Sequence, residues 1–283
     1  MNKLLVTGAS GTLGGPLTER ATADGWEVWS AYYSRPDRIR AGHPIQLDLR
    51  DAEALRRVVA EIEPSAIIHC AITERSQGDY DTAIRLAGQH VAEVAAEMGI
   101  RLVALSTDLV FDGTRDVYTE DTPPQPSANS RYGEAKADAE RSIRATAPKA
   151  AIVRTSLIYD FDPLNAQVAW MIAAIQCGET MRLFTDQIRC PIWAVNLAEA
   201  LLELVETDYG GCLNLVGPEP LSRYDLGTAL LAALGYDPAK HVVAAAAPDS
   251  APRKLVLSIE RAREVLGTPL LTIREACEIW EKH

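Results

Sequence analysis

Short apolar runs alternate with amphipathic stretches through the first 160 residues of the chain. The runs contain few polar positions, which is typical of strands buried on both faces of a parallel sheet. The stretches between them repeat apolar residues at helical spacing. This alternation predicts an α/β fold built on a doubly wound parallel sheet. We expect strands at residues 4–6, 27–33, 44–47, 66–71, 102–105 and 151–158, and helices at 17–23, 52–61, 82–98 and 132–147.

The alternation becomes less regular beyond Tyr159, where no glycine motif follows a strand. This half is therefore expected to cover a substrate rather than to bind a dinucleotide. The division predicts a Rossmann domain over 1–160, to which 191–216 returns, and a smaller C-terminal α/β substrate-binding region over 161–190 and 217–283. We expect helices at 167–176, 194–206, 222–234 and 260–266, a strand at 212–216, and irregular structure at 178–190 and 244–252.

Glycines at three-residue spacing follow the first apolar run, in the sequence KLLVTGASGTLGG. A strand that enters a glycine turn and then a helix directs the helix's free N–H groups and positive dipole end toward a phosphate. Gly8 would allow the tight turn, Gly11 the close approach of a pyrophosphate, and Gly14 the packing of helix on strand. The alternative is an ordinary βα turn. Because the motif follows the first strand, we expect the turn, including Ser10, Thr12 and Leu13, to bind a dinucleotide.

The end of the second predicted strand bears on which nicotinamide cofactor is used. Ser34 and Arg35 stand where an NAD enzyme usually places a carboxylate on the ribose 2′-hydroxyl. A hydroxyl and a guanidinium suit a 2′-phosphate instead, because guanidinium binds phosphate bidentately. NADP(H) is therefore favoured over NAD(H), with Asp37 as the rival ribose ligand and a solvated charged loop as the alternative. Asp48, before Leu49, could accept from the adenine amino group, cap the helix at 52–61, or do both.

Charge and cysteine content narrow the possible partners. The formal net charge of −11 argues against non-specific binding to nucleic acid or to an anionic membrane. The five cysteines show no paired spacing, which predicts neither a disulfide framework nor a metal site and suits a reducing cytoplasm. No signal peptide or membrane-spanning run is recognised. One face of the helix at 82–98 could pair with a second subunit in a homodimer, although packing on the sheet is the commoner outcome.

Tyr132 and Lys136 are one helical turn apart and so share a helix face. A free tyrosine has a pKa near 10, but an ammonium about 4 Å away at an effective dielectric near 20 favours the phenolate by roughly 4 kcal/mol. That shift makes the phenol an effective acid–base catalyst near neutral pH. Thr107 ends the fifth predicted strand, at the edge where open α/β sheets bind ligands, and its hydroxyl could hold a substrate carbonyl.

Several motifs in this order resemble the extended short-chain dehydrogenase/reductase family. They are TGASGTLG, LDLRD, STDLVFDG, RYGEAK and VRTSLIY, with PIWAVNLAEA, LNLVGPEPLSRYDLG and APRK later in the chain. Within the family the chain most resembles dTDP-4-dehydrorhamnose reductases and their sugar-nucleotide-binding relatives. The resemblance implies catalytic roles for Thr107, Tyr132 and Lys136, with Lys136 also bonding the nicotinamide ribose. It further implies cofactor contacts at the glycine turn, Asp48, Leu49, Cys70, Ala71, Tyr132 and Thr155.

Two positions differ from the usual reductase pattern. The reductases commonly have asparagine-alanine-alanine after the fourth strand, where this chain has His69, Cys70 and Ala71. They also tend to carry a sugar-facing tryptophan where this chain has Leu157. Both differences are similar to the regulatory β subunit of methionine adenosyltransferase, which binds NADP. For His69 a core histidine bonded to backbone is the favoured interpretation, with a catalytic histidine as the alternative.

The resemblance favours an NADP(H)-dependent reductase of a keto group on a nucleotide-activated sugar. The alternatives are a non-catalytic NADP-binding regulatory subunit and an NAD-dependent sugar-nucleotide epimerase or dehydratase, for which Asp108 is the available acidic residue. Thr73, Glu74, Arg189 and Arg253 are the candidate substrate contacts, the two arginines for a diphosphate or, equally, as ordinary surface residues.

Overall fold

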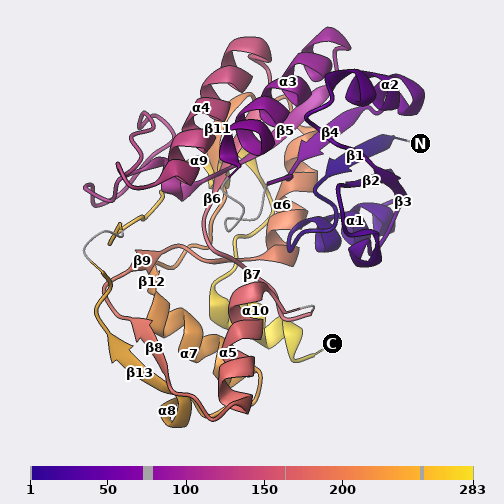
Figure 1. The fold of residues 1–283 in the computed structure, drawn as a ribbon. Coiled ribbons are helices and arrows are strands. Elements are labelled where there is room, and N and C mark those ends of the chain that lie inside the picture. Colours follow the sequence, from indigo (N-terminus) through magenta and orange to yellow (C-terminus); the bar gives the residue numbers. More distant parts are fainter. Residues whose placement is uncertain (1, 73–78, 163, 249–251, 283) are drawn as a thin grey trace.

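A seven-stranded parallel sheet forms the centre of the computed structural model, which describes residues 2–72, 79–162, 164–248 and 252–282 (Figure 1). The strand order is β11-β6-β5-β4-β1-β2-β3, so the chain moves outward in one direction from β1 and then restarts on its other side at β4. The predicted doubly wound sheet is confirmed. Its strands are β1 (Lys3–Thr7), β2 (Glu27–Tyr32), β3 (His43–Gln46), β4 (Ala66–His69), β5 (Arg101–Thr107), β6 (Ala151–Thr155) and β11 (Gly211–Asn214).

Helices cover both faces of this sheet, because neighbouring residues of a buried strand point to opposite sides. Leu4 and Val6 pack with the helices of one face, and Leu5 packs with those of the other. The first face holds α1 (Gly14–Ala23) and α6 (Ala194–Glu206), and the second holds α2 (Ala52–Ile62), α3 (Ala87–Glu97) and α4 (Arg131–Thr146).

The buried side of α3 packs against the sheet, and the helix also contacts α2 and α4. The turns just before α3, Asp81–Leu86, are π-helical, so the expected single helix at 82–98 has two parts. Pairing of its outer face with a second copy of the chain stays a prediction. None of the helices in the described part of the chain has the length and apolar character that crossing a bilayer requires.

Two expectations about the first half are wrong in detail. Asp51, not Asp48, caps α2, since its carboxylate accepts a hydrogen bond of 2.9 Å from the Ala54 N–H. The strand expected at 151–158 is interrupted: β6 ends at Thr155, and β7 (Ile158–Tyr159) pairs with β10 (Ile192–Trp193) outside the central sheet.

A second apolar core lies outside the central sheet, around Met171, Leu183, Trp193 and Leu230; its elements fill the lower part of Figure 1. The segments expected to be irregular contribute to it: β8 (Met181–Phe184) pairs with β13 (Val242–Ala245). The sequence pattern did not predict these strands, because each is short and its partner lies far away along the chain. The other elements here are α5 (Ala166–Gln176), β9 (Ile188–Arg189), β12 (Leu221–Ser222), α7 (Arg223–Ala233), α8 (Pro238–His241) and α10 (Ile273–Trp280).

The two cores are the physical basis for the division into a dinucleotide-binding and a substrate-binding region, which we retain as a proposal. β11 lies at the edge of the central sheet and α6 packs on it, so 191–216 contributes to the first core. The helix α9 (Glu260–Val265) also lies against β11, and Leu266 joins the same core. α9 and Leu266 therefore pack on the central sheet, although they lie within the range 217–283 that was assigned to the substrate-binding region.

Candidate active site

The glycine turn brings the backbones of three elements together where β1 ends. Gly8 has φ of +73°, a conformation that side-chain-bearing residues rarely adopt. A Cβ on Gly8 would lie 2.7 Å from the Ala71 Cα, so the absence of a side chain lets β4 end directly beside the turn. A Cβ on Gly14 would overlap the Gly8 carbonyl oxygen and lie 2.6 Å from the Ala9 Cα. Gly11 and Thr12 remain exposed at the tip of the turn.

Gly14→Ala tests this close approach. Because backbone atoms surround the position, we expect the added methyl group to lower the free energy of unfolding by about 1–3 kcal/mol and to weaken NADPH binding. Urea unfolding and a fluorescence titration with NADPH would measure the two effects. Gly88→Ala, inside α3, is the matched control, since its Cβ would make ordinary contact at 3.5 Å with the Ala139 side chain of α4. The control should be neutral or stabilising by up to about 1 kcal/mol; equal losses in both variants would contradict the assignment.

The expected adenine-ribose end lies at the carboxyl ends of β2 and β3. Ser34 is exposed and Arg35 partly buried, both in the turn after β2. Asp48 accepts hydrogen bonds of 2.8 and 2.7 Å from Arg50 Nε and Nη2, and these bonds lower the pKa of the carboxyl group. Arg50 also donates to the Tyr33 hydroxyl at 2.8 Å. The sequence interpretation did not include Arg50, although its position two residues after Asp48 was visible.

The last residue of β4 is His69, a buried histidine. Thr7 Oγ1 and His69 Nδ1 are 2.8 Å apart, so the ring bonds to a hydroxyl on the neighbouring strand, and the expected backbone partner is wrong. Burial and the nearby Lys136 ammonium lower the pKa of His69 to about 3. Burial raises the pKa of the adjacent Cys70 thiol to about 12. Both groups are therefore uncharged near neutral pH. The candidate substrate residues Thr73 and Glu74 lie outside the described residues.

The start of α4 packs against the end of β5, where the proposed catalytic groups lie. Lys136 is buried and its Nζ donates to the Leu105 carbonyl at 2.9 Å. A Cβ on Gly133 would overlap the Leu109 carbonyl oxygen, so the small residue beside Tyr132 permits this close contact. Tyr132 is partly buried, and its ring meets the Tyr80 ring edge-on at 6.0 Å between centroids. Thr107 Oγ1 accepts from the Leu109 N–H at 3.2 Å.

Burial lowers the pKa of Lys136 from 10.5 to about 8, against the opposing effect of the Cys70 thiol and the Glu140 carboxylate. A lysine with this pKa is still mostly protonated at pH 7, so its charge can support a phenolate. The ammonium is surrounded by groups from two elements: His69 and Cys70 at the end of β4, and Glu140 on its own helix. The site thus holds a cation that titrates within the range in which enzymes are assayed.

A pH profile tests this environment. We expect kcat/KM for carbonyl reduction to fall above pH about 8, because the Lys136 ammonium that supports the Tyr132 phenolate is lost there. Stability should respond in the opposite direction: between pH about 8 and 10.5 the unfolded chain holds a proton at this residue that the folded chain has released, so unfolding costs more as pH rises. A kcat/KM that stays constant to pH 10 would contradict the expectation.

Asp108 and Arg189 form a buried ion pair beside Thr107. Arg189 Nε donates to Asp108 Oδ2 at 2.5 Å and Nη2 donates to Oδ1, while Ser156 Oγ donates to Oδ2 at 2.5 Å. The structure therefore gives Arg189 an internal partner, Asp108. Arg253 is partly exposed and binds Asp186. A diphosphate contact through either arginine stays a prediction.

β6 ends at Thr155, whose side-chain hydroxyl is buried. Thr155 is 6 % exposed, and its Oγ1 has no hydrogen-bond partner within the described ranges. Buried hydroxyls are usually bonded, so an unused one beside the strand ends fits a position that a ligand completes. Together with the exposed tip of the glycine turn, this fits a nicotinamide dinucleotide lying across the carboxyl ends of β1, β4, β5 and β6.

Glu140 extends the stripe of Tyr132 and Lys136 by one more turn of α4. Its carboxylate accepts from Ser106 Oγ at 2.6 Å and from Arg154 Nη2 at 2.8 Å. Arg154 also donates to the carbonyl oxygens of Glu120 and Thr122. The sequence interpretation missed this network, although an acidic residue four positions after Lys136 on the same helix face was a usable signal.

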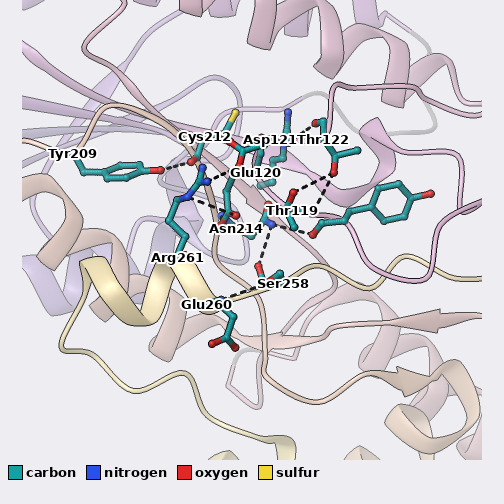
Figure 2. Close-up of polar contacts among 12 residues, drawn as sticks. Thr119, Glu120, Asp121, Thr122, Tyr209, Cys212, Asn214, Ser258, Glu260 and Arg261 are labelled. Atoms are coloured by element: carbon teal, nitrogen blue, oxygen red, sulfur yellow. Dashed lines mark hydrogen bonds and ion pairs between the residues drawn. The ribbon is translucent and has the colours of Figure 1, made fainter.

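Figure 2 shows the polar contacts that hold residues 120–122, the segment whose Glu120 and Thr122 carbonyls accept from Arg154. The Asn214 N–H donates to Glu120 Oε1 at 3.1 Å, and Arg261 donates to Asp121 at 2.7 Å. Residues 120–122 are thereby tied to β11 and α9. A cavity of about 810 Å³ opens between this segment and α4, and charged side chains lining it, such as Arg85 and Asp138, bind each other. We place the candidate site at the strand ends instead.

Proteins of known name are similar to this chain over most of its length. A reductase of dTDP-4-keto-6-deoxy-D-glucose from Streptomyces niveus is 32% identical over 84% of this chain and 81% of its own length. The beta subunit of methionine adenosyltransferase 2 from Xenopus tropicalis is 29% identical over 85% of this chain and 74% of its own.

The fold has a solved counterpart as well. The crystal structure of dTDP-4-dehydrorhamnose reductase from Bacillus anthracis, in complex with NADP, superposes with a TM-score of 0.85 at 23% identity, covering 100% of this chain and 99% of that one. The family model described as the RmlD substrate binding domain matches residues 1–280. This chain therefore belongs to the RmlD substrate-binding domain family, as its resemblance to the extended short-chain dehydrogenases predicts.

Proposed function

We propose that the protein is an NADP(H)-dependent reductase of a keto group on a nucleotide-activated sugar. The observation that carries this is the packing of α4 on β5, which brings the buried Lys136 within 2.9 Å of the Leu105 carbonyl, two residues before Thr107. Tyr132 lies one helical turn before Lys136, at the same end of the sheet as the glycine turn. The relative from Streptomyces niveus, named as a sugar-nucleotide reductase, supports the substrate class.

In this proposal each residue has one task in reducing the carbonyl. When bound, the reduced nicotinamide supplies the hydride to the carbonyl carbon. Thr107 donates a hydrogen bond that orients the carbonyl oxygen, and Tyr132 transfers its phenolic proton to that oxygen. Lys136 stabilises the phenolate that remains, because its buried ammonium lies on the same helix face.

For the cofactor we propose NADP(H) in preference to NAD(H), which stays possible. The support is the pair Ser34 and Arg35 at the end of β2, since a hydroxyl and a guanidinium suit a 2′-phosphate. The exposed tip of the glycine turn would receive the pyrophosphate, and Asp48, held by Arg50, would accept from the adenine amino group. Thr155 and the backbone at Cys70 and Ala71 would border the nicotinamide.

The state of Asp108 argues against the dehydratase alternative. Such an enzyme needs an acidic side chain free to move a proton, and Asp108 is the residue available after Thr107. Its carboxylate is 0 % exposed and both oxygens accept hydrogen bonds from Arg189. A carboxylate occupied in this way is a poor proton donor or acceptor for a substrate.

The regulatory alternative rests on a relative, the beta subunit from Xenopus tropicalis, and on Leu157 and the His69-Cys70 pair. The intact set of Thr107, Tyr132 and Lys136 counts against it.

For either function, the free cysteine thiols, which are spread over separate elements, support a reducing compartment such as the cytoplasm.

Turnover separates these possibilities. The purified chain is mixed with NADPH and a panel of dTDP-activated 4-keto-6-deoxy sugars, and NADPH absorbance is followed. Consumption that depends on the sugar nucleotide supports the reductase. Tight NADPH binding without consumption, together with co-purification of a partner enzyme, would favour the regulatory subunit. A chain that binds no NADPH would overturn both.

A further inference from the structure

The carboxylate next to the proposed carbonyl-orienting hydroxyl is saturated with hydrogen bonds. Asp108 Oδ2 accepts from Arg189 Nε and from Ser156 Oγ, each at 2.5 Å, and Oδ1 accepts from Arg189 Nη2. Thr107 Oγ1 donates to the same Oδ1 at 3.2 Å, the longest of the four bonds. Asp108 is 0 % exposed and Arg189 is 5 % exposed, so the pair is shielded from water.

These distances indicate how the hydroxyl proton of Thr107 is shared. A hydrogen bond from a hydroxyl to a carboxylate normally lies between 2.5 and 2.7 Å, roughly, so a separation of 3.2 Å is a weak contact. The Leu109 N–H donates to Thr107 Oγ1 and holds this oxygen in place, while the hydroxyl hydrogen is free to rotate. The proton can therefore turn from Asp108 toward a substrate carbonyl at little cost.

Arg189 is what keeps that contact weak. Its guanidinium neutralises the carboxylate and takes a lone pair on each oxygen. Without it, Asp108 would be a buried anion whose remaining donors, among the residues that the structure describes, are Ser156 and Thr107, and it would hold the Thr107 proton tightly. Arg189 comes from β9, which pairs with β12 in the proposed substrate-binding region, so this region sets the charge balance beside the hydroxyl.

We propose that Arg189 is a positioning residue: by neutralising Asp108 it frees the Thr107 hydroxyl to hydrogen-bond the substrate carbonyl oxygen. The inference rests on the proposed reductase function and deepens it, since it assigns Arg189 a role that is exerted through two other side chains.

A double-mutant cycle between Arg189 and Thr107 tests the inference. Arg189→Gln is made in the wild-type chain and in Thr107→Val, and kcat for the keto-sugar nucleotide is measured at saturating NADPH. We expect a loss of about tenfold or more in the wild-type background, the size of one hydrogen bond to a developing charge. In Thr107→Val, which has no hydroxyl proton to lose, the loss should be under about twofold.

An equal loss in both backgrounds would overturn the inference, because Arg189 would then act only by holding the two regions together. Arg274→Gln is the matched control, an 87 % exposed arginine of α10 that pairs with Glu278, and it should leave kcat unchanged. If Arg189→Gln does not fold, Arg189→Lys replaces it in the same cycle; it keeps the charge with fewer donors and should lose about threefold, again only when Thr107 is present.

The outcomes for the inference and for the proposed function are distinct. An active wild-type chain with additive losses overturns the role of Arg189 and leaves the reductase standing. A wild-type chain that reduces none of the keto-sugar nucleotides overturns the reductase, and the role of Arg189 with it.

Discussion

Replacing Tyr132 by phenylalanine is expected to lower kcat by about 10²–10⁴-fold, the contribution that a positioned acid–base group makes. The variant keeps the ring, and with it the edge-on contact with Tyr80. It removes the hydroxyl group, and with it the proton that the carbonyl oxygen must receive. NADPH affinity should change by less than about threefold, because the glycine turn and Lys136 are untouched.

Steady-state NADPH consumption and a fluorescence titration would measure the two quantities. Tyr80→Phe is the matched control, since it deletes a hydroxyl from the ring that faces Tyr132 at 6.0 Å between centroids and should keep near wild-type kcat. A Tyr132→Phe variant within tenfold of the wild-type kcat would show that another group delivers the proton.

Glu140→Leu is expected to lower the free energy of unfolding by about 3–5 kcal/mol, the cost of leaving a buried charge without its partner. Arg154 is 0 % exposed and Glu140 is 2 % exposed, so water cannot replace the lost carboxylate. Ser106 would lose its acceptor at the same time. Urea unfolding followed by circular dichroism would measure the change.

Removing both charges separates a buried-charge penalty from a packing defect. Glu140→Leu combined with Arg154→Met should regain much of the lost stability, because no uncompensated ion remains. The recovery is incomplete, since the carbonyls of Glu120 and Thr122 lose their donor. Asp138→Asn, on the same helix, breaks a partly exposed ion pair with Arg85 and should cost under about 1 kcal/mol. A loss of that size for Glu140→Leu would contradict the prediction.

Periodicity predicted the central sheet well because several of its strands, such as β1 and β4, are short apolar runs with a helical pattern close behind them. The second region was predicted less well. β8 alternates buried Met181 and Leu183 with exposed Arg182, but it is short and pairs with β13 some sixty residues later (Figure 1). Without that partner the segment carries no stronger signal than an irregular loop.

The candidate site divides in the same way. Tyr132 and Lys136 were found because helical spacing alone places them on one face. Glu140 continued the same face and was overlooked. The partner of Arg189 could not be read from the chain, since an arginine near a candidate substrate region is equally consistent with a diphosphate ligand and with an internal ion pair.

The sequence by itself determined the alternation of strands and helices, the glycine turn after β1 and the pairing of Tyr132 with Lys136, because these depend on residues within one or two helical turns of each other. Only the tertiary structure decided which charges meet. Arg189 reaches Asp108 across 81 residues, and Arg154 reaches Glu140 from a neighbouring strand. Such buried pairs form where folding excludes water from both partners, and that exclusion is a property of the packed chain.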